Sequence, residues 1–258
     1  MQPASDADQT ARDRARNFEN RFEGKLKYGY RGIPIFAAPG LHELAAERLA
    51  AARPDAANTE VLELGAGGGA LSQRLVDQGY PVCASDLFDS NFTPRGKIPF
   101  VALDLNQAFA EQMQRRFDVV VALELVEHLE NPHHFFRQCR QLLREDGCLL
   151  VSTPNLANPV SQAMFVRQGL FQWFRDEDYR DQGHITPLAP IVLQRCWREA
   201  GFRCTWEGSV SDPYRRLHRR RNFGMRSLAR LLSLCSGTPR ALRGEVYLAM
   251  LRPEAASP

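Results

Sequence analysis

Short apolar runs alternate with helix-like segments through the middle of this chain. The runs occupy residues 60–65, 81–86, 98–105, 117–125 and 147–154. Between them, apolar residues recur with helical spacing in 71–79, 106–116 and 131–147, the last with Pro132 near its start and Gly147 at its stop. Near-continuous apolar strands that alternate with helices predict a parallel sheet whose two faces are both covered.

The C-terminal part continues this pattern and then departs from it. A helix is predicted at 188–201, a strand at 202–210 and a terminal strand at 245–251. Between the last two, residues 211–243 carry an apolar stripe with helical spacing, made of Met225, Leu228, Leu231, Leu232 and Cys235. We assign residues 41–258 to a single domain and residues 1–40 to an N-terminal arm, which either folds over the site as a lid or docks as an ordinary helix.

The net charge of +3 hides a local concentration of arginine. Residues 211–243 hold nine arginines and one acid, a net charge of +8, whereas the rest of the chain sums to −5. A basic amphipathic segment predicts contact with an anionic membrane, a phosphate-bearing substrate or, least favoured of the three, nucleic acid. Packing of the apolar stripe on the domain, with the arginines left in solvent, explains the pattern equally well.

Composition limits the class of protein. A hydrophobic content of 44% suits a globular chain with a sizeable core. The N-terminus lacks the apolar stretch of a secretory leader, and no run of about 18 apolar residues predicts a membrane span. The six cysteines are scattered without a CxxC motif, which predicts reduced, buried thiols. We therefore expect a cytoplasmic protein, peripheral to the inner face of the membrane if residues 211–243 contact lipid.

The stretch VLELGAGGGA (61–70) ends the first predicted strand with glycines, which let the backbone turn sharply and approach a ligand. Ligands of parallel α/β sheets bind beyond the carboxyl ends of the strands. Asp86 ends the second predicted strand, Asp104 and Leu105 end the third, and ALELVEHLENP closes the fourth. This ordered series predicts a nucleoside site in which Asp86 accepts hydrogen bonds from the ribose hydroxyls.

Two kinds of cofactor fit that series. The spacing Gly65-x-Gly67-x-x-Ala70 satisfies the dinucleotide fingerprint, so a dinucleotide-dependent oxidoreductase is one alternative. Glu63, two residues before Gly65, would repel a pyrophosphate and attract an ammonium and a sulfonium. We therefore predict S-adenosylmethionine, bound by Glu63, Gly65, Ala66, Gly67, Asp86, Leu87, Asp104, Leu105 and Glu124.

Together these motifs resemble those of class I S-adenosylmethionine-dependent methyltransferases. The likeness runs from about residue 59 to 251. Within it, GHITPLAPIVLQRCWREAGF resembles a late segment of ubiquinone-pathway O-methyltransferases, methionine-biosynthesis-like methyltransferases and glycan-modifying relatives. The resemblance implies an α/β, Rossmann-like fold: a seven-stranded, mostly parallel sheet of order 3-2-1-4-5-7-6, with the last strand antiparallel and helices on both faces.

The implied reaction is in-line methyl transfer, in which the protein mainly aligns donor and acceptor. A hydroxyl acceptor also needs a base or a metal to lose its proton, and His128 and His184 are the candidate catalytic residues. His128 has the alternative role of closing a strand–helix turn. Metal-dependent relatives share E-x-x-E-H and a distant histidine, which implies a divalent ion on Glu124, Glu127, His128 and His184. Metal-free relatives carry the same E-x-x-E-H, so the metal ligands stay open.

The expected activity is therefore O-methylation of a small-molecule, glycan or lipid-linked acceptor. A non-catalytic, regulatory protein that binds S-adenosylmethionine is the second alternative. The expected membrane contact is through residues 211–243.

Overall fold

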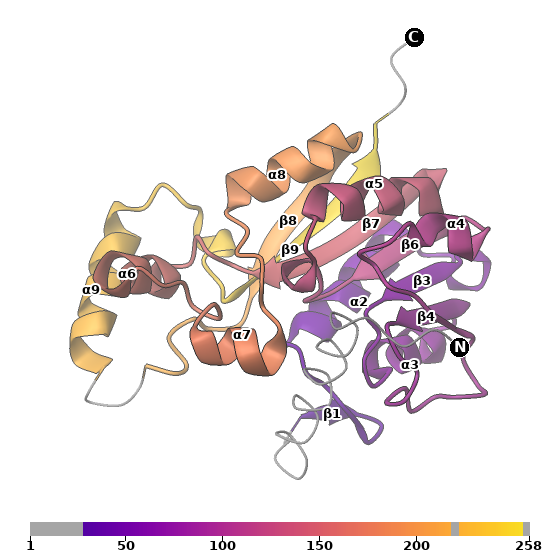
Figure 1. Cartoon of the computed structure of the whole chain (residues 1–258), viewed down its shortest axis with the longest axis horizontal. Helices are drawn as coiled ribbons and strands as arrows, with labels where there is room; N and C mark the ends of the chain where they lie inside the picture. The colour runs from indigo at the N-terminus through magenta and orange to yellow at the C-terminus, as the bar shows by residue number, and fades with distance from the viewer. Residues whose placement is uncertain (1–27, 218–221, 255–258) are drawn as a thin grey trace, which may run out of the picture.

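The computed structural model describes residues 28–217 and 222–254, and its centre is one seven-stranded sheet (Figure 1). The strands follow the order β5-β4-β3-β6-β7-β9-β8. Their bounds are β3 Val61–Leu64, β4 Val82–Asp86, β5 Phe100–Ala102, β6 Phe117–Ala122, β7 Leu143–Pro154, β8 Phe202–Val210 and β9 Val246–Pro253. Numbered from β3, this is the order 3-2-1-4-5-7-6 that the sequence predicts.

Helices cover both faces of the sheet. Helices α2 (Leu41–Ala52) and α3 (Ala70–Asp77) pack into one apolar layer, and α4 (Phe109–Met113), α5 (Pro132–Leu142) and α8 (Pro190–Glu199) into the other. The inner strands divide their side chains between these layers: in β6, Val120 and Ala122 join one cluster, while Val119 and Val121 join the opposite one. This division explains the continuous apolar runs, because nearly every residue of such a strand is buried.

The register fixes where the long connections leave the sheet. Strand β9 runs antiparallel to both neighbours, with Pro154 of β7 and Val210 of β8 each paired to Val246. The chain after β7 and the segment between β8 and β9 therefore both emerge at the carboxyl ends of the parallel strands. That edge is where an α/β sheet of this kind binds its ligands.

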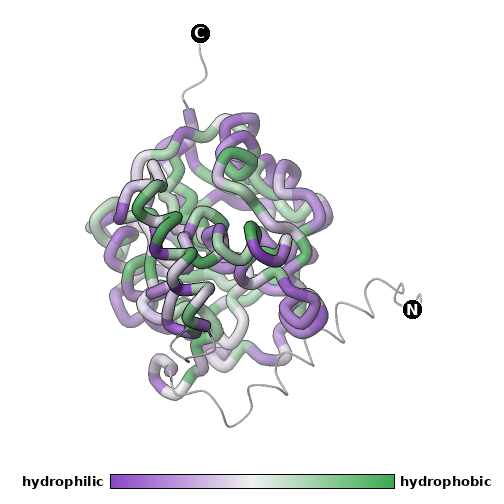
Figure 2. Tube along the Cα trace, turned by 90° about the vertical axis from the view of Figure 1, so that its left-hand side faces the viewer, coloured by the Kyte–Doolittle hydropathy of each residue, from purple (hydrophilic) through white to green (hydrophobic). Residues whose placement is uncertain are grey.

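Beside the sheet, α6 (Pro159–Gln168) and α9 (Phe223–Cys235) pack together as a separate two-helix lobe, at the left of Figure 1. In Figure 2, which faces this lobe, hydrophobic and hydrophilic stretches alternate along the trace. The predicted stripe is divided: Met225 is buried, and Leu228 and Leu232 pack in the lobe, but Leu231 is 58% exposed and Cys235 is exposed. Arg219, Arg220 and Arg221 lie outside the described residues.

The helix predicted at 131–147 is too long at its C-terminal end. Helix α5 ends at Leu142, and Leu143 already pairs with Phe117 of β6. Gly147 is therefore not a helix stop. A Cβ there would lie 3.0 Å from the carbonyl oxygen of Arg144 and 3.1 Å from that of Asp118, so glycine allows β7 to approach β6 closely.

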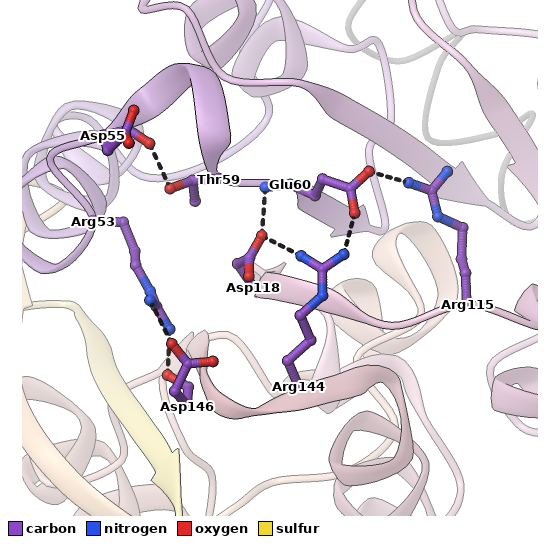
Figure 3. Close-up of polar contacts among 8 residues, drawn as sticks. All are labelled: Arg53, Asp55, Thr59, Glu60, Arg115, Asp118, Arg144 and Asp146. Carbon is purple, nitrogen blue, oxygen red and sulfur yellow. Dashed lines mark hydrogen bonds and ion pairs between the residues drawn. The ribbon is translucent and has the colours of Figure 1, made fainter.

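A polar network closes the amino-terminal edge of the sheet, opposite the ligand edge (Figure 3). Arg144 bonds to Asp118 and Glu60, both at 2.5 Å, and Arg115 bonds to Glu60 at 2.7 Å. The beginnings of β3, β6 and β7 are thereby held together by charge-assisted bonds.

Several elements have no counterpart in the sequence prediction. These are helices α2, α6 and α7 (Asp176–Gln182), the short helices Ala56–Asn58, Val126–His128 and Arg240–Leu242, and the hairpin of β1 (Gly29–Tyr30) and β2 (Ile33–Pro34). The predicted arm falls mostly on residues 1–27, outside the described part, but Ile33 and Ile35 pack on Ala70 next to the glycine turn. Of the six thiols predicted to be buried, Cys204 and Cys235 are exposed.

Candidate active site

The glycine turn after β3 is bent by residues with left-handed backbone. Gly65 and Gly67 have φ of 72° and 52°. A Cβ on Gly65 would lie 2.9 Å from Cδ1 of Leu125, whereas a Cβ on Gly67 would meet no atom within 4 Å. Gly67 therefore leaves open space beside the backbone. Ala66 ties the turn to the next strand, because its N–H donates to the carbonyl of Ser85 at 2.9 Å.

Asp86, at the end of β4, is anchored to this turn. Its Oδ2 accepts from the N–H of Gly67 at 2.8 Å, and its Oδ1 accepts from the N–H of Leu87 at 2.7 Å. Burial raises the pKa of Asp86, although these two bonds act to lower it. Each oxygen keeps a lone pair, so the carboxylate can accept further bonds from a diol.

Glu63 lies inside the sheet rather than at the surface of the turn. The side chain is 5% exposed, and the hydroxyl of Ser72 in α3 donates to its carboxyl. Burial, helped by the charge of Asp86, raises the pKa of Glu63 to about 8. The carboxyl is therefore mostly protonated at neutral pH, and the negative charge on which the sequence argument relied develops only beside a cation.

The remaining predicted cofactor residues follow along the same edge. Asp104 lies just beyond β5 and accepts from the N–H of Asn106 at 2.9 Å. Leu105 is buried in the core, while Leu87 is half-buried. Glu124, just beyond β6, has a φ of 49°, and Ser152 of β7 donates to its Oε1 at 3.1 Å.

A second cluster forms where the chain after β6 meets the loop at 183–186. The carbonyl oxygen of Glu127 accepts from the N–H groups of Ile185 and Thr186 at 3.0 and 2.9 Å. These bonds bring His184 beside His128, with ring centroids 4.9 Å apart. One ligand atom from each of Glu127, His128 and His184 lies within 4.8 Å of the others.

Both histidines are oriented by backbone carbonyls. Nδ1 of His128 lies 3.2 Å from the oxygen of Gly183, and Nδ1 of His184 lies 2.7 Å from the oxygen of Trp173. Because a carbonyl can only accept, each Nδ1 carries the hydrogen and each Nε2 keeps its lone pair. The His128 side chain thus ties its turn to the 183–186 loop.

The electrostatics of this cluster favour its uncharged forms. Burial raises the pKa of Glu127 to about 8, and burial together with the charge of Glu127 raises the pKa of Glu124. Burial lowers the pKa of His128 to about 3 and also lowers that of His184.

The donors of this cluster fit a divalent cation. Both carboxyl oxygens of Glu127 are fully buried without a hydrogen-bond partner among the described residues, and its Oε1 is 4.0 Å from Nε2 of His128, too far for a hydrogen bond. Two imidazole lone pairs beside an unpaired buried carboxyl form a set that metals with mixed nitrogen and oxygen ligands accept.

Known families identify the fold. The family described as a methyltransferase domain matches residues 36–207. The chain belongs to this family. Membership confirms the predicted class I methyltransferase and its cofactor S-adenosylmethionine, and it decides against the dinucleotide that the glycine spacing left open.

Curated relatives of this methyltransferase include ubiquinone biosynthesis O-methyltransferases. That of Azorhizobium caulinodans is 30% identical over 163 residues, which are 60% of this chain and 63% of the relative. That of Rickettsia canadensis is 32% identical over 114 residues, 42% of this chain and 48% of the relative. The chain thus spans about half the length of the curated relatives it matches.

Solved structures share the fold at low identity. A SAM-dependent methyltransferase from Archaeoglobus fulgidus has a TM-score of 0.53 and 19% identity, covering 81% of this chain and 93% of its own. The 1,6-didemethyltoxoflavin-N1-methyltransferase of Burkholderia thailandensis, solved with 1,6-didemethyltoxoflavin and S-adenosylhomocysteine, has a TM-score of 0.59 and 16% identity, covering 99% and 93%. In the part of this methyltransferase that the structure describes, no helix combines the length and hydropathy needed to cross a bilayer.

Sequence reasoning missed the groups that hold the site residues in place. Ser72 and Ser152, which bond to Glu63 and Glu124, stand in no motif, and neither do the carbonyls of Trp173 and Gly183. A backbone carbonyl carries no residue-type signal, so only the fold could reveal the last two.

Proposed function

We propose that this protein transfers the methyl group of S-adenosylmethionine to a hydroxyl oxygen of a small-molecule acceptor. The observation that carries the proposal is the cluster of Glu127, His128 and His184, with two free Nε2 atoms and an unpaired buried carboxyl. Such groups are suited to removing or polarising the proton of a hydroxyl. The names of the curated relatives support oxygen as the atom methylated.

The cofactor would be held along the ends of β3, β4 and β5. Asp86 accepts bonds from the ribose hydroxyls, Asp104 and Leu105 hold the adenine, and the open side of Gly67 lets the backbone approach the cofactor. Glu63 and Glu124 neutralise the positive charge of the aminoacyl part. The cofactor supplies a methyl group already activated by its sulfonium, so alignment is the main task of the protein.

Activation of the acceptor would fall to the second cluster. Glu127, His128 and His184 would hold a divalent ion, which supplies Lewis acidity that lowers the pKa of a hydroxyl, whereas Glu124, the predicted fourth ligand, bonds to Ser152 and does not join the cluster. Without an ion, a neutral Nε2 would be the proton acceptor, although the lowered pKa of His128 and His184 makes each imidazole a weaker base than a free histidine. The carbonyls of Gly183 and Trp173 keep the lone pairs directed away from the backbone.

The acceptor is small or is joined to a lipid or glycan carrier. A lipid-linked acceptor agrees with the outer face of α9, which exposes Phe223 (75%), Leu231 (58%) and Leu234 (84%) beside Arg226 and Arg230. Exposed apolar side chains next to arginines favour peripheral contact with an anionic membrane, and such a contact would place the protein at the inner membrane face.

Turnover assays test the proposal and its regulatory alternative together. The protein is incubated with S-adenosylmethionine and a panel of vicinal diols, with Mg²⁺ or with a chelator, and methylated products are identified by mass spectrometry. His128→Ala and His184→Ala are expected to lose turnover while the affinity for S-adenosylhomocysteine changes little. Variants as active as wild type would remove both histidines from the mechanism, and a chain that binds cofactor but methylates nothing would favour the regulatory role.

A further inference from the structure

Two long segments meet above the carboxyl edge of the sheet. The segment after β7 carries Trp173 and His184, and the segment between β8 and β9 carries Arg215 and Arg216. The two segments leave the sheet at neighbouring positions, because Pro154 of β7 and Val210 of β8 both pair with Val246 of β9. The two arginines therefore lie on the side of the sheet that holds the Glu127–His128–His184 cluster.

Arg216 is in direct contact with the residue that orients His184. Its guanidinium carbon lies 3.9 Å from the ring centroid of Trp173, and the carbonyl oxygen of Trp173 is the 2.7 Å partner of His184 Nδ1. Trp173 has a φ of 71°, a left-handed conformation that is costly for a bulky residue. The surrounding fold therefore holds Trp173 in place, with the indole against Arg216 and the carbonyl against His184.

The arginines near this edge differ in their partners. Arg215 lies 2.5 Å from the fully buried Glu245, and Arg175 pairs with Glu177 at 2.6 Å and with Asp178 at 3.1 Å. Arg216 is exposed and forms no ion pair with any residue that the structure describes. Stacking on Trp173 occupies one face of its guanidinium and leaves the N–H edge available for a ligand.

Cations and carboxylates both act on Arg216: Arg215 and Arg175 disfavour its charged form, and Glu245 and Asp178 favour it. Partial burial and the neighbouring cation of Arg215 lower the pKa of Arg216. The carboxylate of Asp178 acts in the opposite direction on both Arg216 and His184, so the two side chains lie within electrostatic range of one group. An anion beside Arg216 would relieve the repulsion from Arg215.

We propose that Arg216 is a specificity residue that binds an oxyanion on the acceptor, a carboxylate or a phosphate, while the acceptor hydroxyl lies beside His184. This inference rests on the proposed function, because it concerns the acceptor of that reaction. A guanidinium offers two parallel N–H donors to such a group, which fixes the orientation of the acceptor as well as its charge.

Calorimetric titration of the protein loaded with S-adenosylhomocysteine and Mg²⁺ tests this role. The probes are 3,4-dihydroxybenzoate, 3,4-dihydroxyphenylphosphonate and the neutral 3,4-dihydroxybenzamide. Wild type is expected to bind at least one anion about tenfold more tightly than the amide, the scale of one charge-assisted hydrogen bond. The anion that binds more tightly identifies the preferred oxyanion.

Variants test whether Arg216 causes the preference for an anionic probe over the neutral amide. Arg216→Gln is expected to abolish it and to raise the KM of an anionic acceptor with little change in kcat, and Arg216→Lys, which lacks the planar fork, to reduce it. The matched control is Arg195→Gln, an exposed arginine of α8, which is expected to retain it. If Arg216→Gln fails to fold, the affinities of wild type and of Arg216→Lys for the anions and the amide still test the inference.

Equal affinity of wild type for the anions and the amide overturns the inference, and so does an equal loss in Arg195→Gln. If anionic and neutral acceptors are methylated equally well, the role of Arg216 is rejected and the proposed function is unaffected. Selective binding of the anions without any methyl transfer supports the role of Arg216 and rejects the proposed function.

Discussion

His184 donates the hydrogen of its Nδ1 to the carbonyl oxygen of Trp173 across 2.7 Å. This bond leaves the lone pair on Nε2, in a ring that lies beside His128 and belongs to the cluster with Glu127. The geometry of this cluster leads to predictions about proton binding, metal affinity and ligand affinity.

Removal of the Glu127 carboxylate should weaken metal binding. Glu127→Gln is expected to lower the affinity for Mg²⁺ or Mn²⁺ by about tenfold or more, because the ion loses an anionic ligand. In wild type the affinity should rise with pH towards about 8, since a metal must displace the proton that the raised pKa of Glu127 retains. Calorimetry at several pH values measures both effects.

His133→Ala is the control for that experiment. His133 is partly exposed and pairs with Glu199 at 2.9 Å, outside the cluster. An affinity that is insensitive to pH and unchanged in Glu127→Gln would exclude a metal at this cluster and leave a histidine as the base.

Asp86 should contribute strongly to cofactor affinity. Asp86→Ala is expected to weaken binding of S-adenosylhomocysteine by about 1.5–3 kcal/mol, the scale of hydrogen bonds to a charged acceptor. The variant also removes the bond to the N–H of Gly67. Asp146→Asn, at the opposite edge of the sheet, controls for a general effect of losing a carboxylate. Similar calorimetric affinities in wild type and Asp86→Ala would remove Asp86 from the binding site.

Glu63 should make stability fall as the pH rises. Its pKa moves from 4.5 when unfolded to about 8 in the fold. The folded chain therefore keeps a proton that the unfolded chain loses, so the free energy of unfolding decreases between these values and levels off above them. Glu63→Gln should flatten this slope, as measured by denaturant unfolding at several pH values. An unchanged slope would mean that Glu63 titrates normally.

Cofactor binding should also release a proton from Glu63. The ammonium of the cofactor lowers the pKa of a neighbouring carboxyl, so at about pH 7 wild type should release protons on binding S-adenosylhomocysteine. Titrations in buffers of different ionisation enthalpy measure that release. Glu63→Gln should show less of it, and equal release in both proteins would separate Glu63 from the bound cation.

Membrane contact should depend on the outer face of α9. Leu234→Glu, at a residue that is 84% exposed, is expected to reduce sedimentation with vesicles of anionic phospholipid and to leave the melting temperature nearly unchanged. Ile191→Glu on α8, at a residue that is 52% exposed, is the matched control. If wild type does not sediment with the vesicles, or if both variants lose vesicle binding equally, the lobe of α6 and α9 has no specific role at a membrane.

The sheet was predictable because its signal is local. All seven predicted strands are present, and in the inner strands residues such as Val119 and Val120 are buried on opposite faces and must both be apolar. The limits of α5 were not predictable: residues 143–147 fit a helix by themselves, and only pairing with Phe117 makes them extended. Helices α6 and α9 form a lobe because they bury one another, and that pairing is invisible in either sequence alone.

The proximity of two candidate site residues was predictable from the sequence, but their roles stay predictions, and the protonation of Glu63 was not predictable. The resemblance to metal-dependent methyltransferases grouped His128 with His184 although they are 56 residues apart, and the structure brings their rings together. The protonation of Glu63 depends on burial and on the Ser72 hydroxyl, neither of which is encoded by motif spacing.

Val210 and Val246 pair with each other, so the segment between them can evolve independently of the strands at the other end of the sheet. A segment that begins and ends at facing strand positions can change in length at a small cost in loop entropy, without altering the strands that bear the glycine turn. In the proposed site, the donor would be held at the ends of β3, β4 and β5, which lie on the other side of β6 and β7 from β8 and β9. We therefore expect residues 211–245 to tolerate changes of length and sequence that alter acceptor binding, provided that α9 keeps its packing on α6.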